Sequence, residues 1–280
     1  MADKLLLMTA HHKEDPFIPI SQKLFFPIQV GKELSEIDLK INSDNQGDSI
    51  SNKNKTFCEL TAYYYAWKNR DEEYIGLMHY RRIFSSRKYL LHNFTAKIKY
   101  LIMNVIYCFT TPNIHQGYSN LIFTNDIEKV QQISTEFKAY ITRHIEKYDV
   151  FVPKRAHFKF LTLEQNYKIN HYYEDWLLFS ELIETYYPFL NQSLYDISQS
   201  RHGYFYNMFI MKRAYFDEYM QILFDLLFKM ENKVDLSNRS NFQARLFGFL
   251  AERFLNIYLD YLKRTKDISI KELNAVFIDM

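Results

Sequence analysis

The stretch YIGLMHYRRIF, from Tyr74 to Phe84, joins a short apolar run to a polar tail without a turn between them. A run of this length bounded by charged residues is typical of a buried, parallel strand. The tail of His79, Tyr80, Arg81 and Arg82 then leaves the carboxyl end of the strand, where open α/β sheets bind ligands. Because guanidinium groups stay charged and match phosphate oxygens, the tail predicts an anion site, most naturally for a diphosphate. An arginine pair that holds internal carboxylates is the alternative, and residue types do not separate the two.

Three further apolar runs also give way to basic residues. Lys4–Thr9 precedes His11, His12 and Lys13, Asp149–Val152 precedes Lys154 and Arg155, and Asn207–Met211 precedes Lys212 and Arg213. If all four runs are parallel strands, their ends line one positively charged edge. We therefore expect an α/β fold with a mostly parallel sheet between helices, and a helical C-terminal part over residues 214–280.

Composition narrows the class of protein. The chain has 280 residues, and we predict one domain over 1–280 with an insertion at 85–117. A formal net charge of +2 creates no overall field that favours nucleic acid. Cys58 and Cys108 lie far apart without metal-ligand spacing, which indicates a reducing compartment. No run of about 18 apolar residues occurs, so we predict a cytoplasmic protein that does not span the membrane.

Two helices are predicted close to the charged edge. Phe57–Asn69 has apolar residues at helical spacing, and Thr56 with Glu59 can form a capping box at its start. In a helix over Leu163–Tyr187, the residues Glu164, Lys168, His171 and Asp175 fall on one face.

A basic edge beside a carboxylate-bearing helix fits sugar transfer from a nucleotide diphosphate. Such an enzyme stabilises the departing diphosphate and, with inversion, deprotonates an acceptor hydroxyl. Arg81 and Arg82 suit the first task and Glu174 or Asp175 the second, although an acidic pair on a solvated helix face is the alternative. A divalent cation (Mn or Mg) is possible, but the chain contains no Asp-x-Asp motif. Our hypothesis is that cationic side chains neutralise the diphosphate in place of a metal.

Nine segments resemble a bacterial family of domains, formerly of unknown function, that is found in capsular polysaccharide, exopolysaccharide and lipopolysaccharide synthesis and is regarded as a glycosyltransferase family. They are TAHHK (Thr9–Lys13), FPIQVG (Phe26–Gly31), DNQGDSISNKN (Asp44–Asn54), CELTAYYYAWKN (Cys58–Asn69), YIGLMHYRRIF, YDVFVPK (Tyr148–Lys154), HYYEDW (His171–Trp176), NMFIMKR (Asn207–Arg213) and LAERFLNIYL (Leu250–Leu259). The resemblance implies a nucleotide-sugar-dependent transferase with a single Rossmann-like sheet of the GT-A type.

Together, the residues and the resemblance assign three groups of site residues. The predicted donor-binding residues are Thr9, His11, His12, Asp44, Asp48, Tyr80, Arg81, Arg82 and Lys154. The predicted catalytic residues are Asp175, Glu174 and His79, and the predicted acceptor-binding residues are His171 and Asn207. We predict no protein ligand set for a metal, and Glu59 stays open between a helix cap and a site residue.

The expected reaction moves a sugar from a nucleotide-diphosphate donor, a UDP-sugar, to a lipid-linked cell-surface glycan. The resemblance favours a galactosyl or galactofuranosyl group as the sugar. The basic, aromatic segment Lys97–Phe109 is a candidate contact with the inner face of the membrane, and a core helix is the alternative. A non-catalytic nucleotide-sugar or glycan-binding protein of the same pathway is the alternative function. A metal-dependent phosphoesterase is a third hypothesis.

Overall fold

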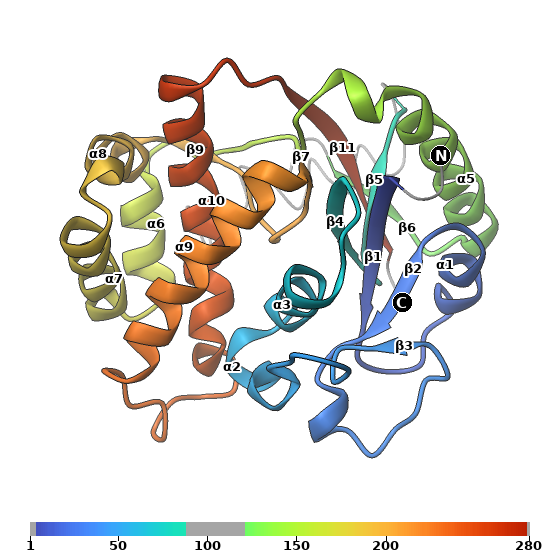
Figure 1. Ribbon diagram of the computed structural model, residues 1–280, viewed down its shortest axis with the longest axis horizontal. Helices are drawn as coiled ribbons and strands as arrows, with labels where there is room; N and C mark the ends of the chain where they lie inside the picture. The colour runs from blue at the N-terminus through green and yellow to red at the C-terminus, as the bar shows by residue number, and fades with distance from the viewer. Residues whose placement is uncertain (1–3, 88–120, 279–280) are drawn as a thin grey trace.

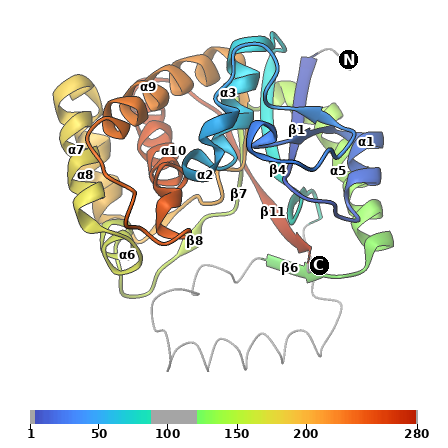
Figure 2. The same ribbon diagram turned by 90° about the horizontal axis from the view of Figure 1, so that it is seen from below.

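The computed structural model describes residues 4–87 and 121–278, which form a mixed sheet of nine strands between helical layers (Figure 1). Helices α1 (Ile18–Leu24) and α5 (Ile127–His144) cover one face of the sheet. Helices α3 (Leu60–Asn69), α9 (Arg213–Glu231) and α10 (Leu246–Thr265) cover the other face (Figure 2). The expected α/β class is confirmed.

The remaining helices and the strands have the following bounds. The other helices are α2 (Asn54–Phe57), α6 (Leu163–Asn170), α7 (Tyr173–Tyr186) and α8 (Asn191–Gln199), with 3-10 turns at Lys32–Leu34, Ser51–Lys53, Ile145–Lys147, Pro188–Leu190 and Gln243–Arg245. The strands are β1 (Leu5–His11), β2 (Phe26–Gln29), β3 (Asn42–Ser43), β4 (Tyr74–His79), β5 (Arg82–Ser85), β6 (Leu121–Thr124), β7 (Val150–Pro153), β10 (Phe209–Lys212) and β11 (Ile270–Ile278). A separate two-stranded sheet joins β8 (Ala156–His157) to β9 (His202–Gly203).

Strands β1, β2, β3 and β4 are parallel. The apolar runs predicted this for β1 and β4, whereas β2 and β3 were not predicted as strands. Leu5 pairs with Tyr74 and Ala10 with His79, so the residues that follow β1 and β4 emerge at one edge of the sheet. Apolar side chains on both faces of these strands enter two cores, one under α1 and α5 and the other under α3, α9 and α10. Burial on both faces explains why the runs carry no alternation of polar residues.

The fourth apolar run points the other way, so the prediction of four parallel strands was wrong. Strand β10 is antiparallel to β4 and to β7, with Phe209 opposite Leu77 and Lys212 opposite Tyr74. Lys212 and Arg213 therefore lie at the far edge, and Asn207 lies level with His79. A doubly buried strand carries no residue pattern that sets its direction, and tertiary packing decides it.

The last nine described residues correct the prediction of a helical end over residues 214–280. After α9 and α10 the chain enters the sheet as β11, which is antiparallel to β5 and parallel to β6 and β7. Pairs β4–β10, β10–β7, β7–β11, β11–β5 and β5–β4 close a ring of five strands. The sheet as a whole is therefore mixed, and the parallel arrangement holds only for its β1–β4 part.

Both helices predicted close to the charged edge are interrupted. The first breaks at Cys58, whose φ of 53° is left-handed, and α3 begins only after Glu59. The expected capping box is absent, because the Thr56 hydroxyl donates to the Lys53 carbonyl and no side chain caps α3. The second breaks after α6, where His171 is extended. Glu164, Lys168, His171 and Asp175 therefore do not share one helical face.

No helix within residues 4–87 and 121–278 is long and apolar enough to cross a membrane. The predicted insertion at 85–117 lies outside the described residues from position 88 onward, as does the whole Lys97–Phe109 segment.

Candidate active site

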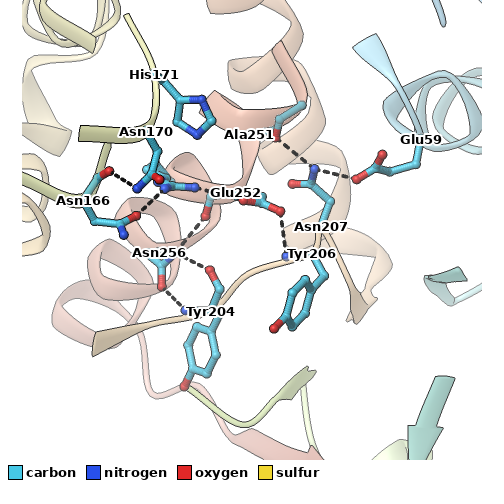
Figure 3. A network of polar contacts seen from close by, with 12 residues as sticks. Glu59, Asn166, Asn170, His171, Tyr204, Tyr206, Asn207, Ala251, Glu252 and Asn256 are labelled. Atoms are coloured by element: carbon cyan, nitrogen blue, oxygen red, sulfur yellow. Dashed lines mark hydrogen bonds and ion pairs between the residues drawn. The ribbon is translucent and has the colours of Figure 1, made fainter. Parts of the chain in front are cut away.

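The break at Cys58 turns Glu59 toward the end of β4. The Cys58 backbone has φ 53° and ψ −135°, which α-helices exclude, and it separates α2 from α3. Glu59 is buried at 7% exposure, and its side chain faces Asn207 (Figure 3). The sequence left Glu59 open between a helix cap and a site residue, because nothing in the residue pattern indicates a left-handed cysteine before it.

Three side chains from separate parts of the chain meet there. Asn207 Nδ2 donates to Glu59 Oε1 over 2.8 Å and to the Gly248 carbonyl over 3.0 Å, which fixes the orientation of the amide. His79 Nε2 lies 3.6 Å from the other carboxylate oxygen of Glu59. Burial alone raises the pKa of Glu59, but the His79 charge and the bonds from His79 and Asn207 outweigh it and lower the pKa to about 2. Glu59 is therefore a fixed anion behind His79.

Arg81 and Arg82 follow this cluster and have no carboxylate within salt-bridge distance in residues 4–87 and 121–278. Arg81 is exposed. The half-buried Arg82 guanidinium lies 4.7 Å from the Tyr206 ring centre and 4.8 Å from that of Phe277, and its Nε has no hydrogen-bond partner there. Aromatic faces hold a cation without using its N–H donors. In the described chain, the arrangement thus disfavours a pair that only holds internal carboxylates.

Other cations surround the same edge. The pKa of His12 is lowered by burial first and then by the positive charges of Lys13, His79 and Arg245. The His12 ring meets Tyr80 edge-on at 5.0 Å between centroids, and Lys13 Nζ lies 5.8 Å from the centre of the same tyrosine ring. An anion placed here would relieve the mutual repulsion of these groups.

Arg245 extends the positive charge to the α10 side. Its Nε lies 3.2 Å from Cys58 Sγ. Burial first, and then the Glu59 charge, raise the pKa of Cys58 to about 12, although Arg245 opposes them. The thiol is therefore protonated at neutral pH, which disfavours a cysteine nucleophile.

The structure places the predicted residues of β1 below this edge. Thr9 and His11 are fully buried, and His11 Nε2 lies 3.1 Å from Thr9 Oγ1. His11 Nδ1 lies 2.7 Å from Asp15 Oδ2, and Thr9 also contacts the Ser21 hydroxyl. These contacts make an internal polar chain that anchors the end of β1 to α1. Lys154, by contrast, is exposed just after β7.

The two aspartates of the polar loop lie apart from each other. Asp44 is fully buried and accepts from the Gly31 amide over 2.8 Å and the Lys32 amide over 3.2 Å. It stabilises the left-handed turn at Gly31 that follows β2. Asp48 is exposed, and its amide donates to Asn69 Oδ1 at the end of α3, near the start of β4. The structure does not bring Asp48 to the cluster around Glu59.

The predicted acid pair lies on α7. Asp175 is 3% exposed and forms a two-pronged ion pair with Arg239, whose Nη2 donates to Oδ1 over 2.8 Å. Glu174 beside it is exposed. This geometry favours a structural role for Asp175, and an action of either residue on substrate stays a prediction.

His171 lies in the link between α6 and α7, stacked 4.1 Å from the Phe249 ring of α10. Its Nδ1 is 3.3 Å from Gln243 Oε1. Burial and the charge of Arg253 lower its pKa to about 4, so the ring is neutral at physiological pH. A neutral ring beside aromatic partners suits contact with a sugar better than contact with a phosphate.

Sequence reasoning missed two charged residues of α10. Glu252 Oε1 accepts from the Tyr206 amide over 2.9 Å, and Arg253 Nη1 donates to Glu252 Oε2 over 2.9 Å (Figure 3). The LAER segment had contributed to the family resemblance, but a Glu-Arg pair inside an apolar helix gives no sign of which strand it faces.

A divalent cation has no ready ligand set at this edge. In the ranges that the structure describes, no group of three or more histidine, cysteine or acidic residues could hold a metal ion. The oxygens of Glu59 are engaged by an amide and an imidazole instead.

A protein family described as "Domain of unknown function (DUF4422)" matches residues 6–264 of the chain. The chain belongs to the DUF4422 family. The family resemblance stated from the sequence is thereby confirmed. No curated protein matches the chain. A solved structure titled as the apo form of WbbM, a bifunctional glycosyltransferase, is similar at 26% sequence identity with a TM-score of 0.82. The similarity covers 99% of this DUF4422 chain and 46% of the WbbM chain, so the chain spans about half of that protein.

Proposed function

We propose that this DUF4422 chain is a glycosyltransferase that moves a sugar from a nucleoside-diphosphate donor to a hydroxyl of a cell-surface glycan. The observation that carries the proposal is the pair Arg81 and Arg82, which leave the end of β4 without carboxylate partners in the described chain. They lie beside the His79–Glu59 contact, in a fold similar to that of a bifunctional glycosyltransferase.

The departing diphosphate gains negative charge as the glycosidic bond to the donor breaks. Preorganised cations that face this charge lower the barrier, because they need no reorganisation during the reaction. Arg81 and Arg82 supply guanidinium donors, and the His79 imidazole, held by the Glu59 anion, lies opposite Arg82 in the β4–β5 pair. We keep the cation hypothesis: these side chains take the role that a metal has in many nucleotide-sugar transferases.

Exposure divides the remaining donor-site residues into two groups. The exposed His12 and Lys154 are proposed to contact the donor, whereas the buried Thr9, His11 and Asp44 are proposed to support the backbone around it. Tyr80 is only 8% exposed, and it is proposed to contact the donor because its ring lies against His12 and Lys13. A role for Asp48 requires a donor that extends toward the end of α3. Asn207 and His171 are proposed to contact the acceptor.

The finer assignments follow the family resemblance. We propose a GT-A-type architecture, with the parallel β1–β4 part of the sheet as its nucleotide-binding half. The proposed donor is a UDP-sugar, with galactosyl or galactofuranosyl as the transferred group. The proposed acceptor is a lipid-linked glycan of a capsule, exopolysaccharide or lipopolysaccharide, reached in the cytoplasm from the inner face of the membrane.

A donor panel tests the proposed function. Nucleotide release is measured from UDP-, GDP-, dTDP- and CMP-sugars, with crude lipid-linked glycan as acceptor, with and without a strong chelator. We expect release from one donor that depends on acceptor and survives chelation. Donor binding without release from any donor would favour the alternative, a binding protein of the same pathway. Release that chelator abolishes and manganese or magnesium alone restores would overturn the cation hypothesis.

A further inference from the structure

The segment that leads into β10 has an unusual backbone. Tyr206 has φ 76° and Asn207 has φ 49°, so two consecutive residues with side chains adopt the left-handed region. Residues other than glycine avoid this region, and they stay there only where surrounding contacts enforce it. Strained backbone conformations are common at functional sites, so the residues that hold Tyr206 and Asn207 in place are candidates for a functional role.

One face of α10 supplies several contacts to this segment. Gly248, Glu252 and Asn256 are spaced by four residues and therefore lie on the same side of the helix. Along this stripe, the Gly248 carbonyl accepts from Asn207 Nδ2 over 3.0 Å. Glu252 Oε1 accepts from the Tyr206 amide over 2.9 Å and Asn256 Oδ1 from the Tyr204 amide over 2.6 Å (Figure 3). Gly248 and Asn256 contribute neutral hydrogen-bond acceptors, whereas Glu252 also brings a titratable carboxylate to this stripe.

Tyr206 contacts both Glu252 and Arg82, and so links this carboxylate to the proposed anion site. Tyr206 donates its amide to Glu252 and lays its ring 4.7 Å from the Arg82 guanidinium. The Glu252 side chain is 18% exposed, against 7% for Glu59 and 3% for Asp175, so it is the most accessible of these three carboxylates. Only Tyr206 therefore separates a reactant bound to Arg82 from the partly exposed Glu252 carboxylate.

The two glutamates of the site have opposite electrostatic environments. Burial first, and then the charge of Glu59, raise the pKa of Glu252, against the lowering effects of Arg253, the Tyr206 amide and Arg82. The pKa of Glu59 is lowered. Neighbouring carboxylates whose pKa values are driven apart commonly divide acid–base and electrostatic work between them.

We propose that Glu252 is the carboxylate that takes the proton of the acceptor hydroxyl. This inference rests on the function proposed above. The acceptor oxygen forms a bond to the anomeric carbon of the donor, and the bond from that carbon to the diphosphate oxygen breaks. The electron pair of the broken bond leaves with the diphosphate, next to Arg81 and Arg82, and the hydroxyl proton passes to Glu252. The step needs no further reactant.

Glu59 serves the same step without receiving the proton. Its oxygens are held by Asn207 and His79 and its side chain is only 7% exposed, which makes it a positioning residue that acts through them.

The oxygens of Glu252 are also engaged, by the Tyr206 amide and by Arg253, but its side chain is 18% exposed and a carboxylate has further lone pairs that can accept from a hydroxyl. Asp175 would have to leave Arg239 before it could reach a substrate. Glu252 is the carboxylate at this edge that combines access with proximity to the arginines.

The test compares Glu252→Gln and Glu252→Asp with Asp260→Asn, which removes a carboxylate from the same helix two turns away, where it pairs with Arg264. Acceptor-dependent turnover and donor affinity are measured for each variant. We expect Glu252→Gln to lose about 10²–10⁴-fold in kcat with donor affinity retained. We expect Glu252→Asp to keep part of the rate and Asp260→Asn all of it.

The pH profile separates proton transfer from a structural role. The charged and titratable groups that face Glu252 include Arg253 on α10, Arg245 just before α10 and Arg82 on β5. Glu59 and the Cys58 thiol face it from the α2–α3 link. We expect the wild-type kcat to fall on the acid side as Glu252 is protonated, and Glu252→Gln to lose this limb from its residual rate. Full turnover by Glu252→Gln, or loss of donor affinity in both Glu252 variants, would overturn the inference. An inactive wild-type protein with every donor would instead overturn the proposed function itself.

Discussion

Two basic pairs follow apolar strands in this chain, and they have opposite surroundings. Arg82, after β4, has aromatic rings on its guanidinium and no carboxylate partner in residues 4–87 and 121–278. Arg213, after β10, donates to Asp217 over 2.8 Å and to the Arg70 carbonyl over 2.6 Å. The difference arises from strand direction, since β10 runs antiparallel to β4 and delivers its basic pair to the opposite edge. A basic pair is a candidate ligand site only where its donors are not already engaged.

The largest effect on donor binding is expected from Arg82→Ala. A hydrogen bond to a charged group contributes about 1.5–3 kcal/mol, so loss of this guanidinium should weaken donor binding by roughly 10- to 150-fold. Calorimetric titration with the active nucleotide-sugar measures the change, and circular dichroism confirms the fold. Donor affinity equal to that of the wild type would break the comparison with Arg213.

Glu59→Gln is expected to lower the stability of the folded chain by an amount that depends on pH. The pKa of Glu59 is about 2 in the folded chain against an ordinary 4.5, so ionised Glu59 stabilises the fold fully above pH 4.5. This contribution, on the order of 3 kcal/mol, is lost as the pH falls from about 4.5 toward 2. Denaturant unfolding across this range should show the wild type exceeding Glu59→Gln in free energy of unfolding at pH 7 and the two converging near pH 2. A gap that does not change with pH would contradict the assignment.

Arg213→Ala is expected to act on stability rather than on substrates. It removes bonds to Asp217, the Arg70 carbonyl and the Trp67 carbonyl, and so should lower the free energy of unfolding by about 1–3 kcal/mol. Donor affinity should stay at the wild-type value. A marked loss of affinity in a folded Arg213→Ala protein would show that both basic pairs reach the donor.

Arg81→Ala should weaken donor binding less than Arg82→Ala does. Arg81 is exposed, so water screens its attraction to a phosphate more than it screens that of the half-buried Arg82. We expect about tenfold weaker donor binding, with a steeper response to salt in the wild type than in the variant. A loss that exceeds that of Arg82→Ala would reverse the order of the two arginines.

The sequence predicted strands β1 and β4 and their parallel arrangement, because uninterrupted apolar runs with charged tails have few other interpretations. It did not predict β2, which contains Pro27, or β3, which consists of two polar residues. It could not predict the direction of β10 or the position of β11, which depend on pairing between distant segments. Nor could it predict the break at Cys58, because a left-handed cysteine is enforced by packing rather than by its own preference. The direction of β10 and the break at Cys58 together bring Asn207 next to Glu59. Asn207 was singled out as a site residue from its segment, whereas Glu252 had no local pattern to mark it.

The central claim is that the cations after β4 bind the diphosphate of a sugar donor. Acceptor-dependent nucleotide release by the wild type, Arg82→Ala and Arg213→Ala, each with the same donor panel and glycan, tests it most directly. The account predicts release from one donor by the wild type and by Arg213→Ala, and a loss of at least about tenfold in Arg82→Ala. Equal rates for the wild type and a folded Arg82→Ala protein would contradict it.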